Sequence, residues 1–227
     1  GEILGLGGLA GYGKVGVANG IMGLHPARGA ITVRGRPLKL NDPGASLGER
    51  MAFVSEDRRG VGIMAEESIE LNIVLPSVRV QRRFLKQVAP LLHLLDQSGV
   101  RRHAEEMIRR LDVRTTGPTQ PVGRLSGGNQ QKVCVARAMT LDPEILLVSE
   151  PTRGIDIGAK KLVLDLIVEL NRTRGVTVIV TSSELAELRS ICDRIAIVTR
   201  GKVHAILEPD AADAQYGLAM AGEPMSA

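Results

Sequence analysis

The sequence predicts an α/β fold built on a largely parallel sheet, with a helical segment inserted in its middle. Towards both ends of the chain, short apolar runs alternate with helical stretches, the pattern of parallel strands connected by helices. Residues 145–148 form a continuous apolar run, which is typical of a strand buried on both faces. From 63 to 142 helical periodicity dominates, and glycine is sparse until Gly117. The chain is therefore expected to form a core interrupted by a helical subdomain.

The individual elements follow from these patterns in order. The apolar run 2–6 ends in glycines and precedes a helical stretch that reaches about Met22. Further strands are expected at 30–33, 50–55, 145–148, 176–181 and 195–199, and further helices at 84–95, 103–111, 130–140, 159–174 and 183–189. We expect one domain over 1–227, with a core of 1–62 and 143–208, a helical subdomain of 63–142 and a tail of 209–227. The tail is rich in small residues and is expected to be a weakly held helix.

Composition narrows the classes of function. The 227 residues are 44% hydrophobic and 24% charged, as in an ordinary globular protein. No apolar run approaches the roughly 20 residues that span a bilayer, and no secretory leader is visible. Aromatic residues make up only 2%, which argues against a stacking surface for single-stranded nucleic acid. The net charge of +4 favours no partner by itself, because the densest basic cluster, 79–83, is expected to be a solvated helix face.

The two cysteines indicate neither a disulfide framework nor a metal site. Cys134 and Cys192 lie far apart and match no metal-ligand spacing, so we expect reduced, buried thiols of a cytosolic protein. Gly1 opens almost directly into the first predicted strand, which suggests a piece of a longer chain.

Residues 8–15 carry the spacing of a phosphate-binding loop. Gly8, Gly11 and Gly13 would let successive backbone N–H groups approach phosphate oxygens, and Lys14 would reach the outer phosphates. The last position of such a loop is normally Ser or Thr, whose hydroxyl binds Mg²⁺, but Val15 has no side-chain oxygen.

Two other interpretations of this segment remain open. Residues 11–16 also match the G-x-G-x-x-G pattern of dinucleotide-binding folds, but 29–39 contain no acidic residue to bind a ribose hydroxyl. The glycines are also compatible with a purely structural turn.

A second phosphate-binding pattern lies at 125–132, Leu-Ser-Gly-Gly-Asn-Gln-Gln-Lys. Ser126, Gly127 and Gly128 precede a predicted helix, whose N-terminus offers unpaired N–H donors and a partial positive charge. A serine-capped helix with a glycine-rich entry is the structural alternative.

The motifs together resemble the nucleotide-binding domain of ABC transporters over the whole chain. Residues 8–15 are similar to its Walker A loop, 125–132 to its signature motif and 145–152 to its Walker B strand. Residues 53–58 are similar to its Q-loop, 154–156 to its D-loop and 180–185 to the strand that ends in its histidine switch. The Asn-Gln-Gln-Lys extension resembles the second half of the tandem ATPase subunit of bacterial monosaccharide importers.

The resemblance implies a P-loop NTPase (RecA-like) core with a small antiparallel β portion, and it implies roles for individual residues. Glu150 would polarise the attacking water, and Asp156 would lie in the D-loop. Ser126, Gly127, Gly128 and Gln130 would contact ATP bound by a partner domain.

Four positions depart from the hydrolytic pattern of the family. Val15 lacks the Mg²⁺-binding hydroxyl, and Ser149 replaces the Walker B aspartate, whose carboxylate would hold the metal through water. Glu56 replaces the Q-loop glutamine, and Ser183 replaces the switch histidine. Loss of one such stabilising group costs on the order of 10²–10³ in rate, so this site is expected to be nearly inert although it retains Lys14.

The resemblance therefore implies an ATP-binding domain that powers sugar import and serves mainly its partner's ATP site. The implied cofactors are ATP, and Mg²⁺ at the partner site. The implied partners are a first ABC half or a second copy, a membrane permease contacted near 56–72 and, indirectly, a periplasmic or lipoprotein sugar-binding protein. The implied location is the cytoplasmic face of the membrane, with no nucleic acid. A non-transport ABC ATPase and a non-hydrolytic regulatory or structural domain remain alternatives, and the sugar is not specified.

Overall fold

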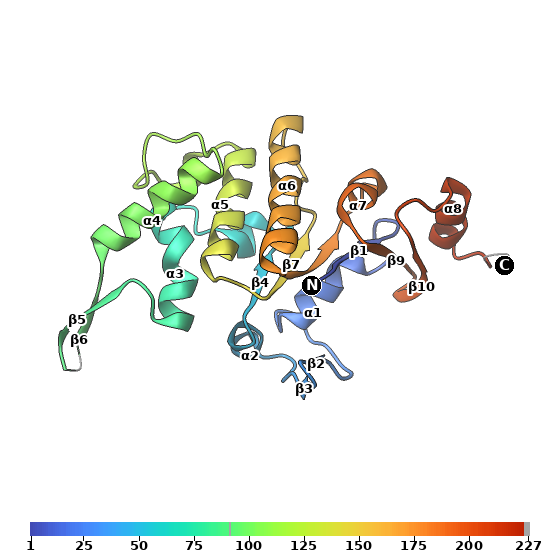
Figure 1. Cartoon of the computed structure of the whole chain (residues 1–227), viewed down its shortest axis with the longest axis horizontal. Helices are drawn as coiled ribbons and strands as arrows, with labels where there is room; N and C mark the ends of the chain where they lie inside the picture. The colour runs from blue at the N-terminus through green and yellow to red at the C-terminus, as the bar shows by residue number, and fades with distance from the viewer. Residues whose placement is uncertain (91, 225–227) are drawn as a thin grey trace. The chain divides into compact units, whose positions relative to one another are not determined.

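The computed structural model describes residues 1–90 and 92–224, and these residues form two compact units. The first unit comprises Gly1–Phe53, Glu144–Pro151 and Leu164–Ala227, and the second comprises Val54–Pro143 and Thr152–Val163. Figure 1 shows the course of the chain through its helices and strands. The domain limits drawn from the sequence stay a prediction.

A six-stranded, mostly parallel sheet forms the centre of the first unit and confirms the predicted fold class. Its strand order is β10-β9-β1-β8-β7-β4, and β1 pairs in parallel with both β8 and β9. The strands are β1 (Ile3–Gly7), β4 (Met51–Val54), β7 (Ile145–Ser149), β8 (Thr177–Thr181), β9 (Arg194–Thr199) and β10 (Lys202–Leu207). Because neighbouring strands are parallel, the carboxyl ends of β1, β7 and β8 lie at one edge of the sheet.

Apolar side chains fix this sheet against its helices. Helix α1 (Lys14–Ile21) lies against β7 and β8, and α7 (Leu185–Ile191) lies against β1. One buried cluster joins α1, the β2–β3 ribbon, the segment before α2 (Pro43–Gly48), β4 and β7; its members are Ala18, Met22, Val33, Leu38, Met51 and Leu147. Helix α6 (Ile157–Arg174) begins in the second unit and continues into the first.

The strand expected at 30–33 is shorter and belongs to a small antiparallel ribbon. Strands β2 (Thr32–Val33) and β3 (Arg36–Pro37) are joined by Arg34 and Gly35, which have φ of 51° and 75°. Positive φ at both central residues is what a tight hairpin turn requires.

The second unit is mostly helical. Helix α3 (Ile69–Gln81) packs against α4 (Gln97–Arg110) and α5 (Gly127–Thr140), and Ile69, Ile73 and Val74 are fully buried. A π-helix, η1 (Arg58–Gly62), and a 3₁₀ turn, η2 (Val122–Arg124), complete the unit.

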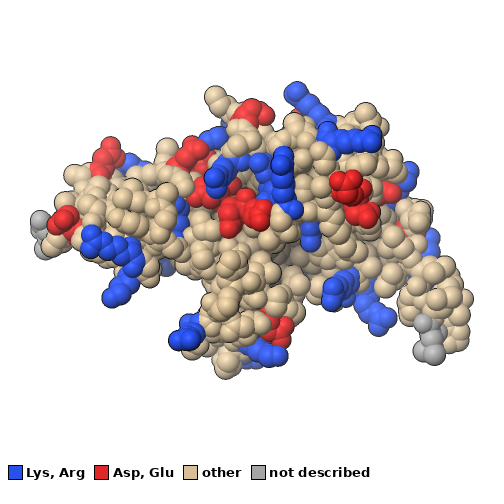
Figure 2. Space-filling view, turned by 180° about the vertical axis from the view of Figure 1, so that it is seen from behind, with Lys and Arg blue, Asp and Glu red and all other residues tan. Residues whose placement is uncertain are grey.

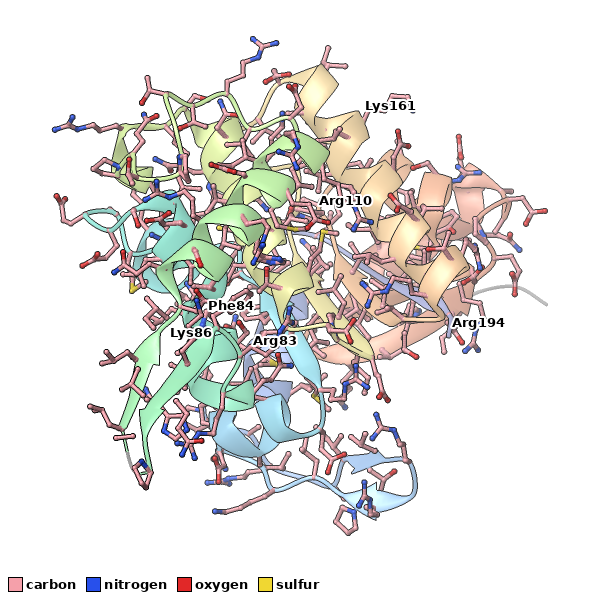
Figure 3. The ribbon with its side chains drawn as sticks, turned by 60° about the vertical axis from the view of Figure 1, so that its left-hand side comes forward. Arg83, Phe84, Lys86, Arg110, Lys161 and Arg194 are labelled. Atoms are coloured by element: carbon pink, nitrogen blue, oxygen red, sulfur yellow. The ribbon has the colours of Figure 1, made fainter. Side chains whose placement is uncertain are left out.

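The helix predicted at 84–95 is wrong. This segment forms a hairpin of β5 (Leu85–Ala89) and β6 (Leu92–Leu95) between α3 and α4, as Figure 1 shows. The apolar spacing imitates a helix, but Pro90 removes an N–H donor and disfavours a helical conformation in the residue before it. Figure 3 shows Arg83, Phe84 and Lys86 at the start of the hairpin, where Arg82 and Phe84 have φ of 55° and 59°.

The tail forms a helix as predicted, but this helix is packed more closely than a weakly held one would be. Antiparallel strand β10, which the sequence did not predict, leads to α8 (Asp213–Ala221), whose Tyr216 is only 1% exposed. The Tyr216 hydroxyl donates to Glu208 O at 2.9 Å, and the Arg189 guanidinium lies 5.3 Å from the ring centroid. Arg189 also donates to Pro209 O at 2.6 Å and Asp213 Oδ1 at 2.5 Å, so α8 is fastened by packing and by charge.

The surface and the thiols agree with the composition. On the face shown in Figure 2, basic and acidic side chains are interspersed. Cys134 and Cys192 are buried free thiols, as predicted, and burial raises their pKa to about 11 and about 12. Among the described residues, no helix has the length and apolarity needed to cross a membrane.

The burial of Tyr216 predicts how firmly α8 is held. Tyr216→Ala should lower the free energy of unfolding by about 3 kcal/mol through cavity formation, measured by urea denaturation. Tyr216→Phe, the matched control, loses only the hydroxyl bond to Glu208 O and should cost about 1 kcal/mol. Equal, negligible effects of both substitutions would contradict the anchoring of α8 by packing.

Candidate functional site

The loop between β1 and α1 has the backbone conformation of an anion-binding loop. Gly8 and Gly13 have φ of 137° and 93°, values that strongly favour glycine. A Cβ at Gly8 would lie 2.2 Å from Val198 O, so β9 leaves no room for a side chain. Gly13 is the N-cap of α1 and provides no side-chain cap, so N–H groups of the first helical turn remain available to a ligand.

Lys14 is buried and lies at the centre of a polar cluster at the carboxyl edge of the sheet, which also includes the half-buried Glu150 and the exposed Ser183. Its Nζ donates to Gly8 O at 3.1 Å and to Ser183 Oγ at 3.2 Å, and lies 3.7 Å from Glu150 Oε1. The Lys14 and Glu150 side chains are only 4% and 10% exposed. The structure therefore brings together Lys14, Glu150 and Ser183, three of the predicted site residues.

Ser183 fastens the Glu150 carboxylate through two hydrogen bonds. Its hydroxyl donates to Oε1 at 2.6 Å, and its backbone N–H donates to Oε2 at 3.1 Å. Glu150 has φ of 48°, and its N–H donates to Thr181 O at 2.8 Å. The carboxylate is thus held towards Lys14 from both its backbone and its side chain.

The donors in this cluster suit a phosphate better than a metal ion. Glycine N–H groups and an ammonium group fit phosphate oxygens, so the residues present fit the phosphates of a nucleotide. Val15 has no side-chain oxygen, and Ser149 Oγ is fully buried without a hydrogen-bond partner among the described residues. Within that part of the chain no three His, Cys, Asp or Glu side chains cluster as metal ligands. The carboxylate of the cluster, Glu150, is already bonded to Ser183 and directed at Lys14, so the residues do not fit Mg²⁺, which prefers carboxylate oxygens.

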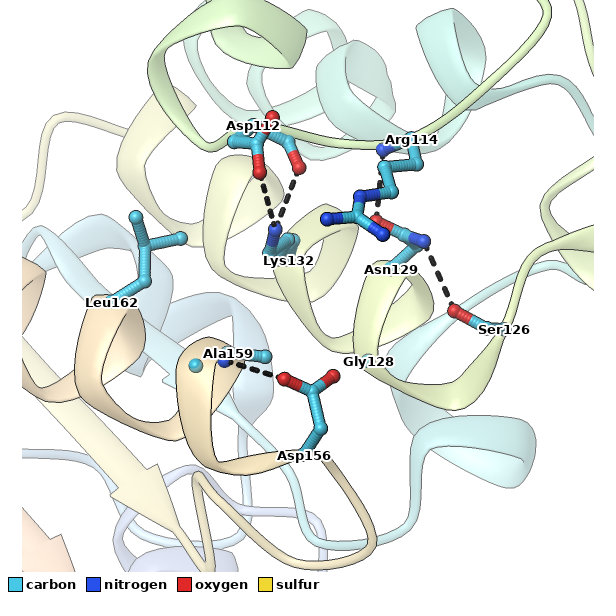
Figure 4. Close-up of a pocket in the computed structure, with 10 residues that line it drawn as sticks. Asp112, Arg114, Ser126, Gly128, Asn129, Lys132, Asp156, Ala159 and Leu162 are labelled. Atoms are coloured by element: carbon cyan, nitrogen blue, oxygen red, sulfur yellow. Dashed lines mark hydrogen bonds and ion pairs between the residues drawn. The ribbon is translucent and has the colours of Figure 1, made fainter.

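A second candidate site lies at the start of α5, in the other unit. A pocket of about 380 Å³ opens there, shown in Figure 4; its lining residues are Asp112, Arg114, Ser126, Gly128, Asn129, Lys132, Asp156, Gly158, Ala159 and Leu162. Ser126 is the N-cap of α5, but its side chain makes no capping bond to the helix backbone. The Ser126 hydroxyl accepts a hydrogen bond from Asn129 Nδ2 at 3.0 Å, so its own proton is available for a ligand.

Asn129, and not Gln130, is the amide side chain that lines this pocket. The Gln130 amide turns back to donate to Leu125 O at 3.1 Å and to Val122 O at 3.4 Å. Asn129 instead faces the pocket, bonding both Ser126 and the Arg114 N–H, which it accepts at 2.9 Å (Figure 4). In the isolated chain the Gln130 side chain thus supports the loop that precedes α5, and its expected contact with a partner's ATP stays a prediction.

Sequence reasoning also missed the charged residues around the pocket. Lys132 Nζ donates to Asp112 O at 2.6 Å and lies 3.5 Å from Asp112 Oδ2, while Figure 4 shows the Arg114 guanidinium beside Asn129. Lys132 was visible in the signature string, but Asp112 and Arg114 lie in a loop that carries no motif.

Asp156 and Glu56 also belong to the second unit, although the sequence associated them with different motifs. Asp156 lines the pocket, and the Ala159 N–H, donating to it at 3.0 Å, holds the pKa of its carboxyl below the usual value. Glu56 follows β4 and is half-buried.

Comparison with known proteins shows what this chain is similar to. The family model described as ABC transporter matches residues 1–153. The ribose import ATP-binding protein RbsA 2 of Rhizobium meliloti is 41% identical over 204 residues, covering 89% of this chain and 38% of that protein. The ribose import ATP-binding protein RbsA of Burkholderia mallei is 40% identical over 212 residues, covering 93% and 40%. The chain thus spans about two fifths of these relatives.

Solved structures share the fold. The dimeric, post-hydrolysis ATP-binding cassette MJ0796, bound to ADP and Pi, superposes with a TM-score of 0.76 at 22% identity, covering 93% of this chain and 87% of that one. The cbiO1 protein of Clostridium perfringens superposes with a TM-score of 0.69 at 20% identity, covering 92% and 77%.

The contact between Lys14 and Glu150 predicts a measurable response to phosphate. Glu150→Gln removes the anionic partner of Lys14 and should lower the free energy of unfolding by about 2 kcal/mol. Inorganic phosphate should then stabilise this variant more than the wild type, because its oxygens replace the carboxylate at Lys14. Thermal unfolding with and without phosphate measures both effects.

Glu223→Gln removes the same charge at an exposed position and serves as the control. Equal stabilisation of wild type, Glu150→Gln and Glu223→Gln by phosphate would contradict competition between Glu150 and a bound anion.

Proposed function

This chain belongs to the ABC transporter family, and we propose that it is an ATP-binding domain that drives sugar import. Support for the substrate class comes from the names of the relatives, which are ribose import ATP-binding proteins about 40% identical to this chain. Because the chain spans only about two fifths of those proteins, the ATPase activity, sugar and partners of the whole assembly are part of the proposal.

The observation that carries the proposal is the contrast between the two phosphate-binding loops. The pocket at α5 presents the Ser126 hydroxyl and the first N–H groups of a helix, with Arg114 and Lys132 nearby. The site at α1 retains its glycines and Lys14, but Val15 has no side-chain oxygen and Ser149, at the end of β7, has no carboxylate. We propose that Ser126, Gly127, Gly128 and Asn129 contact the γ-phosphate region of ATP held by a partner ATP-binding domain.

The loop at α1 would bind a nucleotide mainly through its glycines and Lys14. Glu150, the candidate base for hydrolysis, is fastened by Ser183 and directed at Lys14. A base committed to an internal cation, without metal ligands beside it, is poorly placed to activate water. The domain alone is therefore proposed to be nearly inactive, with ATP as a structural or regulatory ligand in its own site.

The partners follow from this assignment. The ATP that meets the α5 pocket would be held by a first half of the same subunit or by a second copy of the domain, where Mg²⁺ is also expected. A membrane permease would be contacted near 56–72, which places the protein at the cytoplasmic face of the membrane. A periplasmic or lipoprotein sugar-binding protein would deliver the sugar to the permease.

Titration of ATP with and without Mg²⁺ tests the proposed character of the protein's own site. We expect calorimetric affinities that agree within about twofold, because positions 15 and 149 offer the metal no carboxylate. The double substitution Val15→Thr and Ser149→Asp restores both oxygens and should make binding depend on Mg²⁺. Much tighter binding of Mg-ATP by the wild type would contradict the proposal, and no ATP binding at all would favour a purely structural domain.

A bulky cation at the start of α5 tests the role of the pocket lined by Ser126 and Gly128, the signature pocket. Ser126→Arg fills the space before the first N–H groups and should lower the ATPase rate of the assembled transporter at least 100-fold. Ser190→Ala, a hydroxyl removal in α7 of the other unit, should leave the rate within twofold. Normal turnover by Ser126→Arg, or robust hydrolysis by the isolated wild-type chain, would refute the division of labour proposed here.

A further inference from the structure

Arg58, the first residue of η1, contacts the signature loop, residues 126–128 at the start of α5. Its half-buried guanidinium donates from Nη1 to Gly127 O at 2.7 Å. A hydrogen bond from a charged donor is shorter and stronger than one between neutral groups. The contact joins a segment that follows the Q-loop position to the backbone of the first turn of α5.

The carbonyl that Arg58 binds belongs to the same peptide unit as the N–H of Gly128. A trans peptide is planar, so its C=O and N–H point in opposite directions, and none of the peptides in the described residues is cis. Fixing the direction of Gly127 O therefore fixes the direction of the Gly128 N–H. Gly128 lines the signature pocket. We propose that Arg58 is a positioning residue that aims the Gly128 N–H at the phosphate in this pocket.

A glycine pair at a helix end needs such a restraint. Neither Gly127 nor Gly128 has a side chain to limit rotation of the peptide between them, and helix ends fray readily. Ser126 provides no side-chain capping bond that would hold the first turn. A positive charge at the carbonyl oxygen also polarises the peptide, which makes its N–H a better donor to an anion.

The guanidinium lies beside two glycines. A Cβ at Gly127 would lie 3.6 Å from both terminal nitrogens of Arg58, and a Cβ at Gly154 would lie 3.4 Å from Nη2. Arg58 therefore lies against both the signature loop and the turn that leads to Asp156. Substituting either glycine would bring a methyl group against the guanidinium.

The rest of η1 is tied to the same helix. Asp57 caps the turn by accepting the Gly60 N–H at 2.8 Å, and Gly62 O accepts from Arg137 Nη1 of α5 at 2.8 Å. Two contacts thus bond η1 to α5. Arg58 of η1 bonds to the start of α5, and Arg137, in the last turn of α5, bonds to Gly62 of η1. A displacement of η1 must strain or release the Gly127–Gly128 peptide.

This inference rests on the proposed function, because it assumes that the pocket receives a phosphate and that a permease contacts 56–72. Under that assumption, a movement of 56–72 at the permease would shift Arg58. The shift would decide whether the Gly128 N–H points at the phosphate. No further residue is needed between the two segments, because the Arg58 guanidinium bonds directly to the Gly127–Gly128 peptide.

The decisive experiment combines Arg58→Ala with free guanidinium in the assembled transporter. We expect the ATPase rate at saturating ATP to fall about tenfold, and added guanidinium ion to restore it at least threefold by occupying the vacated space. Arg58→Lys should be intermediate, because it keeps the charge without the planar fork. Arg102→Ala, an exposed position on α4, should be within twofold of wild type with or without guanidinium.

A second readout follows the peptide itself and does not depend on the transporter. In the ¹⁵N-glycine-labelled chain, Arg58→Ala should lower the ¹⁵N order parameter of Gly128, because the Gly127–Gly128 peptide loses the restraint on its orientation, and Arg102→Ala should not. An unchanged order parameter at Gly128, or a lost ATPase rate that guanidinium does not restore, would overturn the positioning role. If Ser126→Arg abolishes turnover while Arg58→Ala does not, this inference fails and the proposed function stands. If neither affects turnover, the proposed function fails.

Discussion

Unpaired backbone N–H groups at the start of two helices are the feature on which both candidate sites depend. The first turn of any α-helix leaves donors without intrahelical acceptors, and side-chain caps usually satisfy some of them. Here the N-cap residues are Gly13 for α1 and Ser126 for α5, and neither supplies a side-chain bond to the helix backbone. Donors left available in this way, next to glycines that admit close approach, suit a phosphate.

The two helix starts differ in the groups that surround them. At α1 the nearest cation, Lys14, is already bonded to Gly8 O and directed at Glu150, so an incoming phosphate competes with an internal carboxylate. At α5 the Ser126 hydroxyl is oriented by Asn129, and the neighbouring peptide is held by Arg58. The Ser126 hydroxyl and the Gly128 N–H can thus receive an anion without breaking an ion pair, although Lys132 of the same pocket is paired with Asp112, whereas Lys14 of the α1 loop faces Glu150 directly. This difference in preorganisation supports a division of roles more strongly than the missing metal oxygens alone.

The sequence predicts those parts of the fold in which local pattern and burial agree. The apolar run at β7 and the glycines after β1 have few other structural solutions, and both were located within one or two residues. The hairpin at 85–95 was mistaken for a helix because its apolar spacing fits both periods and only Pro90 distinguishes them. Strand β10 was missed because it is an exposed edge strand, and the anchoring of α8 by Tyr216 and Arg189 involves residues far apart in sequence.

The candidate site shows the same limit at finer scale. Motif order located Lys14, Glu150 and Ser183, but it did not show that these three side chains bond to one another. Gln130 and Asn129 are adjacent and chemically alike, so only the turn of α5 shows which amide faces the pocket. Arg58 carries no motif signal for α5, because its partner is a backbone carbonyl 69 positions away. Every residue has a backbone carbonyl, so the residue type at position 127 does not reveal that Arg58 bonds to it. Sequence patterns therefore cannot show such contacts, even where the direction of an N–H group depends on one.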